Sequence, residues 1–157
     1  MNVVYSSSDE YARHAGVSFA SLFEENKSVE TLNVFVIEYS ISVKNKERLN
    51  CIACQYGRYI EYISFERFSH LIKTDGSYNI SLNSYARLLL ADILPETVGR
   101  ILWLDCDTVV TDSLQELWNM DLRGKSIAAV QDCGAFYDDC VIIHPRYDVL
   151  TPAYVMP

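Results

Sequence analysis

Short apolar runs alternate with segments of helical periodicity along most of this chain, and this alternation restricts the fold more than any other feature of the sequence. Runs of strand type are predicted at residues 2–6, 33–37, 59–63, 100–104 and 127–130. Strands that alternate with helices pair in parallel through right-handed crossovers. The sequence therefore predicts an α/β fold, with a mostly parallel sheet flanked by helices.

Helical segments fill the intervals between these runs. Asp9 can cap the first helix, whose apolar face is expected to lie on the sheet, because burying each larger side chain is worth roughly 1.5–3 kcal/mol. Its members are Tyr11, Ala12, Ala15, Phe19, Leu22 and Phe23. Further helices are predicted over 43–55, 65–73 and 81–94, the last ended by Pro95, and after a capping-box motif at Ser113. The helix over 81–94 is expected to turn inward Tyr85, Leu88, Leu89 and Ile93.

Length and charge exclude several classes of protein. A chain of 157 residues suffices for one domain, and we expect all of 1–157 to belong to it. The formal net charge of −8 argues against a nucleic-acid partner, which would need a basic face. No apolar run approaches the roughly 20 residues of a membrane span, and the N-terminus lacks a signal-peptide pattern. The expected location is the cytoplasm, with peripheral attachment to the inner membrane as a variant.

The cysteines do not suggest a disulfide framework. Their number, five, is odd and no secretion signal is seen, so reduced thiols are expected. Cys51 and Cys54 form a C-x-x-C motif, but a zinc site would need a second pair, and Cys133 and Cys140 are poorly spaced for one. Because the motif falls late in a helical segment, we interpret these two cysteines as residues on a helix face.

The strand at 100–104 ends in Asp105-Cys106-Asp107, the candidate functional motif of the chain. In open α/β sheets ligands gather beyond the carboxyl ends of the strands. Two carboxylates so close together repel each other unless a cation compensates them, and hard oxygen ligands suit Mg²⁺ or Mn²⁺, with phosphate oxygens completing the shell. The alternative is a solvated acidic turn in which one Asp caps the next helix.

The same letters also fit a different class of enzyme. Residues 104–109 match the first motif of haloacid-dehalogenase-type phosphatases, in which the first Asp is the nucleophile and the second the acid–base. That motif normally ends the first strand of its fold, whereas several βα units precede it here. Few residues remain after Asp107 for the Lys and the acidic motif that such enzymes need. This interpretation stays as an alternative.

Ordered blocks along the chain, taken together, are more specific than the acidic motif alone. They comprise residues 4–12, 84–88, 101–109 and 112–122. In these blocks the sequence resembles the family-8 glycosyltransferases, a retaining group that includes bacterial lipopolysaccharide galactosyl- and glucosyltransferases and glycogenin. The resemblance implies a GT-A, Rossmann-like fold. It also implies transfer of a hexose from UDP-glucose or UDP-galactose to a saccharide, glycoconjugate or protein acceptor, with retention.

The resemblance also implies roles for individual residues. Asp105 and Asp107 would bind Mn²⁺, or Mg²⁺, bridging the diphosphate of UDP, with Cys106 between them also at the donor. Arg87 would reach the donor, which is consistent with the pairing of guanidinium groups with phosphate. The alternative for Arg87 is an ordinary position on the surface of a helix.

Three more positions are assigned at the sugar and nucleoside ends of the donor. Asp9 and Tyr11 would lie near the nucleobase or ribose, and Asp132 would contact the sugar as a catalytic residue. Tyr11 could instead be part of the core on its helix, and Asp132 could be a turn residue.

Several parts of the family pattern are missing. Ser8-Asp9-Glu10 stands where some members carry Asp-Asp-Asn, and the later Asn-Ala-Gly and Asp-Gln-Asp blocks and the C-terminal His ligand do not occur. Residues 145–152 resemble a segment well downstream in the family, so we expect a stretch between about 138 and 143 to be absent from this chain. A second hypothesis is therefore a non-catalytic fragment that binds a nucleotide-sugar.

Overall fold

The computed structural model describes residues 1–71, 82–129 and 149–150. The chain divides into two compact units, Met1–Trp118 and Asn119–Pro157. A four-stranded sheet belongs to the first unit and a two-stranded sheet to the second. The expectation that the whole chain belongs to one domain stays a prediction.

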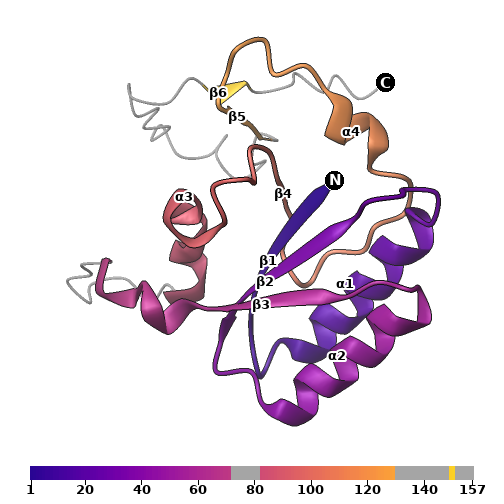
Figure 1. Cartoon of the computed structure of the whole chain (residues 1–157), viewed down its shortest axis with the longest axis vertical. Helices are drawn as coiled ribbons and strands as arrows, with labels where there is room; N and C mark the ends of the chain where they lie inside the picture. Colours follow the sequence, from indigo (N-terminus) through magenta and orange to yellow (C-terminus); the bar gives the residue numbers. More distant parts are fainter. Residues whose placement is uncertain (72–81, 130–148, 151–157) are drawn as a thin grey trace, which may run out of the picture. The chain divides into compact units, whose positions relative to one another are not determined.

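The four-stranded sheet is parallel throughout. Its strands are β1 (Asn2–Ser8), β2 (Asn33–Tyr39), β3 (Ile60–Ser64) and β4 (Leu102–Trp103), in the spatial order β3-β2-β1-β4 (Figure 1). The long apolar runs of β1 and β2 lie next to each other at its centre, as expected for strands buried on both faces. The predicted α/β architecture is confirmed.

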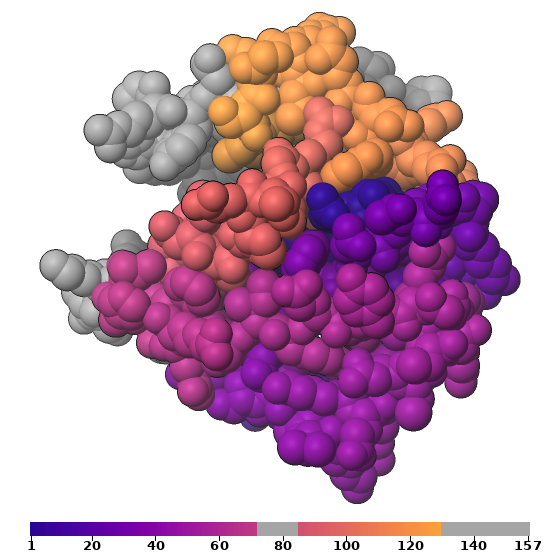
Figure 2. Space-filling view, in the orientation of Figure 1, coloured from indigo at the N-terminus to yellow at the C-terminus, as the bar shows by residue number. Residues whose placement is uncertain are grey.

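Helices cover one face of this sheet. They are α1 (Ala12–Glu25) and α2 (Val43–Gln55), which lie together below the strands in Figure 1. Alternate residues of β1 point to opposite faces of the sheet. Val3 and Tyr5 therefore pack with α1, while Val4 points to the other face and belongs to the apolar cluster there. The segments of α2 and β3, purple to magenta, form much of the surface seen in Figure 2.

Shorter turns contribute to the core on the other face of the sheet. They are the 3₁₀ turns η1 (Phe65–Arg67), η2 (Ser69–Leu71) and η3 (Leu82–Leu88) and the short helix α3 (Leu90–Ile93). Phe65, Ala86 and Ile93 are buried there against Val4 and Ile37. The sheet is thus covered on both faces.

The segment predicted as a helix over 81–94 forms the 3₁₀ turn η3 and then the short helix α3. Ile93 is buried as expected, but the helix type of η3 and the inward position of Leu88 were predicted wrongly. A 3₁₀ helix repeats every three residues rather than every 3.6, which changes the residues that share a face. Ala86 is therefore buried, while Leu88, expected inward, is 72% exposed. Leu94 is extended because the residue before Pro95 avoids the helical region. The segment predicted as a helix over 65–73 likewise forms 3₁₀ turns as far as Leu71.

The first helix differs from the prediction at its N-terminus. α1 begins at Ala12, and Tyr11 is its N-cap residue, 49% exposed and outside the buried face. The turn that leaves β1 ends at this residue, so its side chain lies beyond the packed length of the helix. Asp9 does not cap α1 with its side chain. The remaining predicted apolar positions of α1 are buried.

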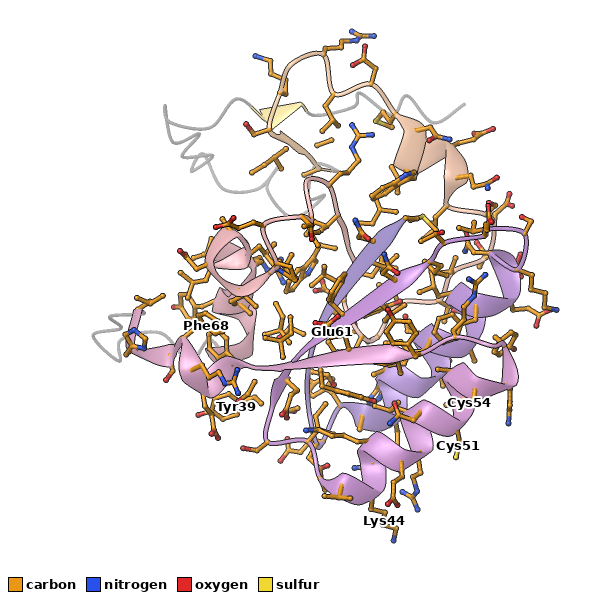
Figure 3. All side chains as sticks on the ribbon, in the orientation of Figure 1. Tyr39, Lys44, Cys51, Cys54, Glu61 and Phe68 are labelled. Atoms are coloured by element: carbon orange, nitrogen blue, oxygen red, sulfur yellow. The ribbon has the colours of Figure 1, made fainter. Side chains whose placement is uncertain are left out.

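The helix predicted over 43–55 is found at those bounds. Ser42 is its N-cap and accepts a hydrogen bond from Asn45 N at 3.4 Å. Cys51 and Cys54 lie on α2 as exposed, free thiols (Figure 3). The helix-face interpretation of the C-x-x-C motif agrees with this position.

The later elements are shorter than the sequence suggests. Only Leu102–Trp103 of the run at 100–104 forms a strand, at one edge of the sheet. The helix expected after Ser113 is α4 (Gln115–Asn119), and the run at 127–130 gives β5 (Ile127–Ala128), parallel to β6 (Val149–Leu150). The expected missing stretch near 138–143 lies outside the described residues. Within the described ranges, no helix combines the length and apolar character needed to cross a membrane.

Candidate functional site

An acidic turn follows β4 at the carboxyl edge of the four-stranded sheet. Leu104 N donates to Val4 O at 3.0 Å, so pairing continues just past the strand. Asp105 and Asp107 are exposed, while the Cys106 thiol between them is buried and donates to Ser6 O at 3.0 Å. Burial raises the pKa of Cys106, so its thiol stays protonated as an anchor. Both carboxylates are thereby left on the surface.

Two donors from neighbouring elements meet at one oxygen of Asp105. Arg87 Nη2, from η3, lies 3.2 Å from Asp105 Oδ1, and Trp103 Nε1 donates to the same oxygen at 3.0 Å. The Arg87 guanidinium also lies over the Trp103 ring, 5.3 Å from its centroid. The structure therefore brings together Arg87 and Asp105, residues 18 apart that the sequence placed at one site.

A chain of three hydroxyl groups, those of Tyr5, Ser18 and Thr108, is hydrogen-bonded to the main chain of the acidic turn. Thr108 Oγ1 donates to Asp105 O at 2.7 Å, so it must accept the proton of Ser18, whose Oγ lies 3.3 Å away. Ser18 in turn accepts from the Tyr5 hydroxyl at 3.1 Å. Burial raises the pKa of Tyr5, so the phenol keeps the proton that it donates. The protons of these three hydroxyl groups all point toward the acidic turn.

The chain after the turn is also tied to α1. Ser21 Oγ accepts from Val110 N at 3.0 Å, and Asn26 Oδ1 accepts from Leu114 N at 2.9 Å. Asn26 is fully buried and closes the C-terminus of α1 by donating from Nδ2 to Leu22 O at 2.9 Å. One helix therefore fixes the loop from the acidic turn to the start of α4.

Asp9 and Tyr11 lie at the carboxyl end of β1. Asp9 Oδ1 accepts from Ser42 N and from Asn45 Nδ2, each at 2.8 Å. These hydrogen bonds, first of all the one from the Ser42 main chain, lower the pKa of Asp9. The Asp9 side chain thus connects the end of β1 with the start of α2. The Tyr11 ring lies 5.5 Å from that of His14.

Two carboxylates of the acidic turn are the candidates for holding a metal among the described residues. Asp105 and Asp107 offer the hard carboxylate oxygens that Mg²⁺ and Mn²⁺ prefer, and such ions are often held by one or two carboxylates with substrate phosphates. Within the described ranges, no group of three or more acidic, His or Cys side chains could hold a metal. The donor set therefore fits an ion whose shell a phosphate ligand completes. Asp132 lies outside the described residues.

Sequence reasoning missed Trp103 and Ser18 as parts of this site. Trp103 was treated as a strand residue, yet it stands two positions before Asp105, and side chains two apart along a strand share a face. That spacing could have identified it. Ser18 lies on α1, 90 residues from Thr108, and no local signal indicates the contact.

Known proteins resemble this chain over most of its length. General stress protein A of Bacillus subtilis (strain 168) is 30% identical over 137 residues, covering 85% of this chain and 47% of that protein. The lipopolysaccharide 1,3-galactosyltransferase of Salmonella typhimurium (strain LT2) is 29% identical over 131 residues, covering 82% of this chain and 38% of that protein. The chain thus spans less than half the length of these relatives.

Solved structures share the fold. The galactosyltransferase LgtC, crystallised with donor and acceptor sugar analogues, aligns with a TM-score of 0.73 at 25% identity, over 88% of this chain and 49% of that one. The fold is thus that of the GT-A glycosyltransferases. The family model described as "Glycosyl transferase family 8" matches residues 2–143, which include the acidic turn, β1 and η3. This chain belongs to glycosyl transferase family 8.

Proposed function

We propose that this chain forms the metal- and donor-binding part of a retaining glycosyltransferase that uses a UDP-sugar. The observation that carries the proposal is the pair of exposed carboxylates, Asp105 and Asp107, at the carboxyl edge of the sheet, with Arg87 beside Asp105. Membership of family 8 supports glycosyl transfer. It also favours this interpretation of the turn over the phosphatase one. Retention follows from the family resemblance alone.

Each residue has a distinct part in this proposal. Asp105 and Asp107 would hold Mn²⁺ or Mg²⁺, which when bound stabilises the charge that develops on a diphosphate leaving group. Arg87 would pair with the same phosphates through its planar guanidinium. The Cys106 thiol faces the core, so any contact of this residue with the donor would come from its main chain.

The other end of the donor would lie at the carboxyl end of β1. Exposed Tyr11 would offer its ring to the nucleoside. Asp9 Oδ1 already accepts from Ser42 and Asn45, so Asp9 would accept hydrogen bonds from the nucleoside with its remaining capacity. Asp132 would contact the sugar. UDP-glucose or UDP-galactose as donor, and a saccharide or glycoconjugate as acceptor, remain part of the proposal, as does the cytoplasmic location.

Thermal unfolding tests the donor site. A ligand at about 100 times its Kd adds about 2.7 kcal/mol, which for a chain of this size corresponds to roughly 5–10 °C in Tm. We expect MnCl₂ and UDP together to give such a shift. Asp107→Asn and Asp105→Asn should remove it, whereas Glu116→Gln, an exposed acid on α4, should keep it. A parent protein without any shift would contradict the proposal.

A second candidate is a fragment that binds the donor without turning it over. The donor set of two carboxylates among the described residues favours it. Release of UDP from UDP-glucose or UDP-galactose, measured on the full chain with Mn²⁺, separates the two. Binding without release of UDP would identify the fragment.

A further inference from the structure

Arg87 places a positive charge on the carboxylate that the proposed metal needs. Its Nη2 lies 3.2 Å from Asp105 Oδ1, and both side chains are about half exposed, 49% and 57%. Two cations on one carboxylate repel each other, so a divalent ion that binds Asp105 must do so against this guanidinium. In the ligand-free protein Arg87 thus opposes the metal.

The guanidinium has a second support that does not depend on Asp105. It lies over the Trp103 ring, 5.3 Å from its centroid, and the Trp103 indole donates to Asp105 Oδ1 independently of Arg87. The Arg87 guanidinium can therefore leave the carboxylate of Asp105 and keep its contact with the Trp103 ring. Asp105 then still accepts the hydrogen bond from the Trp103 indole. This arrangement allows the arginine to change partners without a large rearrangement.

The geometry points to Arg87 as a partner-exchange residue: it pairs with Asp105 in the free protein, and a diphosphate group draws it away as the metal takes the carboxylate. Metal and nucleoside diphosphate therefore help each other to bind. This inference rests on the proposed function and adds to it the dependence of one ligand on the other.

The exchange has a thermodynamic signature. If the diphosphate raises metal affinity by some factor, the metal raises diphosphate affinity by the same factor. Part of that factor comes from direct metal–phosphate bonds and part from release of the Arg87–Asp105 pair. An exposed ion pair of this kind accounts for about 1.5- to 5-fold in an equilibrium constant.

The sign of one measurement separates this role from simpler ones. Removing an arginine that competes with the metal tightens the binding of Mn²⁺ alone. Removing an arginine that only binds phosphate leaves Mn²⁺ affinity unchanged. Removing an arginine that only positions Asp105 weakens it.

The experiment measures Mn²⁺ binding to the full chain by electron paramagnetic resonance of the free ion, at about 0.15 M salt, with and without UDP. Titrations without protein remove the contribution of the Mn²⁺–UDP complex. We expect Arg87→Ala to bind Mn²⁺ alone about 1.5- to 5-fold more tightly and UDP more weakly. The factor by which UDP raises Mn²⁺ affinity should be smaller in Arg87→Ala than in the parent. It should decrease by the same factor by which the variant binds Mn²⁺ alone more tightly. In the parent, uridine, which lacks phosphate, should leave Mn²⁺ affinity unchanged.

Arg13→Ala is the matched control, because it removes the same charge from an exposed position on α1. Its Mn²⁺ affinity measures the general effect of net charge, which is subtracted. Should Arg87→Ala lose its near-ultraviolet circular dichroism, Arg87→Gln replaces it. Unchanged or weaker Mn²⁺ binding in the folded Arg87 variant overturns the partner exchange while the proposed function stands. A parent that binds neither Mn²⁺ nor UDP overturns both.

Discussion

The carboxylates at this edge of the sheet differ in the donors that the protein already gives them. Asp9 receives a main-chain and a side-chain donor from the start of α2, both at 2.8 Å. Asp105 receives Arg87 and Trp103. Asp9 is thus a fixed part of the scaffold, whereas one partner of Asp105 is a half-exposed cationic side chain that a phosphate can attract.

Asp9→Ala should lower stability in a pH-dependent way. Hydrogen bonds lower the folded-state pKa of Asp9, so its contribution is fully present above its unfolded pKa, near 4, and is lost as the pH falls through the folded value. Urea unfolding of parent and variant between about pH 7 and pH 2 measures the difference. It should be constant from pH 7 to 5 and shrink below about pH 4. A difference that does not shrink at all between pH 7 and pH 2 would contradict this role.

At single positions, the sequence predicted residue types better than partners. Asp105 and Asp107 could be named because carboxylates after a buried strand have recognisable chemistry, and Arg87 because its block resembles one of the family. Asp9 was expected to cap the helix that follows it and instead bonds to α2, 33 residues on. Such partners depend on which strands pair, and this information is absent from local spacing.

Among the elements, α1 both packs on the sheet and holds the loop beyond the acidic turn. Its apolar face meets β1 and β2, while Ser18, Ser21 and Asn26 bond to the chain between Thr108 and Leu114. Ser21 and Asn26 accept from partly buried main-chain N–H groups of the loop, and Ser18 gives the Thr108 hydroxyl a second partner. The helix therefore determines the path of the loop.

Asn26→Ala should reduce the free energy of unfolding by about 1–3 kcal/mol, because Leu114 N loses its acceptor and Leu22 O keeps only one of its two donors, the main-chain N–H of residue 26. Denaturant unfolding measures the change. Asn50→Ala, which removes an exposed asparagine of α2 that accepts one bond from Tyr62, should stay within about 0.5 kcal/mol of the parent. Equal losses in the two variants would contradict the anchoring role.

Elements with strong periodicity were predicted well, and those shaped by their surroundings were not. The helix over 43–55 could be predicted from Leu49, Ile52 and Ala53 on one side, of which Leu49 and Ala53 are buried in α2. The segment over 82–93 has helical composition, but it forms a 3₁₀ turn before a short helix, with Ala86 packed against the sheet. A change from 3.6 to 3.0 residues per helical turn cannot be recognised from the amino-acid composition of the segment.

For the molecule as a whole, stability should be concentrated in the middle of the four-stranded sheet. β1 pairs with β2 along its full length and with β4 through Val3 and Val4, and both of its faces are covered. α4, by contrast, has five residues and no buried one. Opening free energies in such a structure range from near zero to the global value.

Hydrogen exchange should show this gradient. The amides of β1 and β2 should exchange slowest, and those of α4 should exchange orders of magnitude faster. Mass spectrometry of peptides covering 2–8, 33–39 and 115–119 measures it. Equal protection in all three would contradict the proposed distribution of stability. The expected order could have been guessed from the apolar runs at 2–6 and 33–37, but the weak pairing of β4 could not, since its run at 100–104 is equally apolar.

The short pairing of β4 bears on protein engineering. Because the pairing of β4 ends at Leu104 N, the tripeptide at 105–107 owes its placement to side-chain hydrogen bonds, from the Cys106 thiol to Ser6 O and from Thr108 to Asp105 O. Transplanting those three residues onto the end of a strand in another scaffold would transfer the two carboxylates without the contacts that orient them. A working graft would have to include the cysteine anchor together with the serines and asparagine of α1, so the smallest portable module is a strand–helix–strand unit rather than a loop.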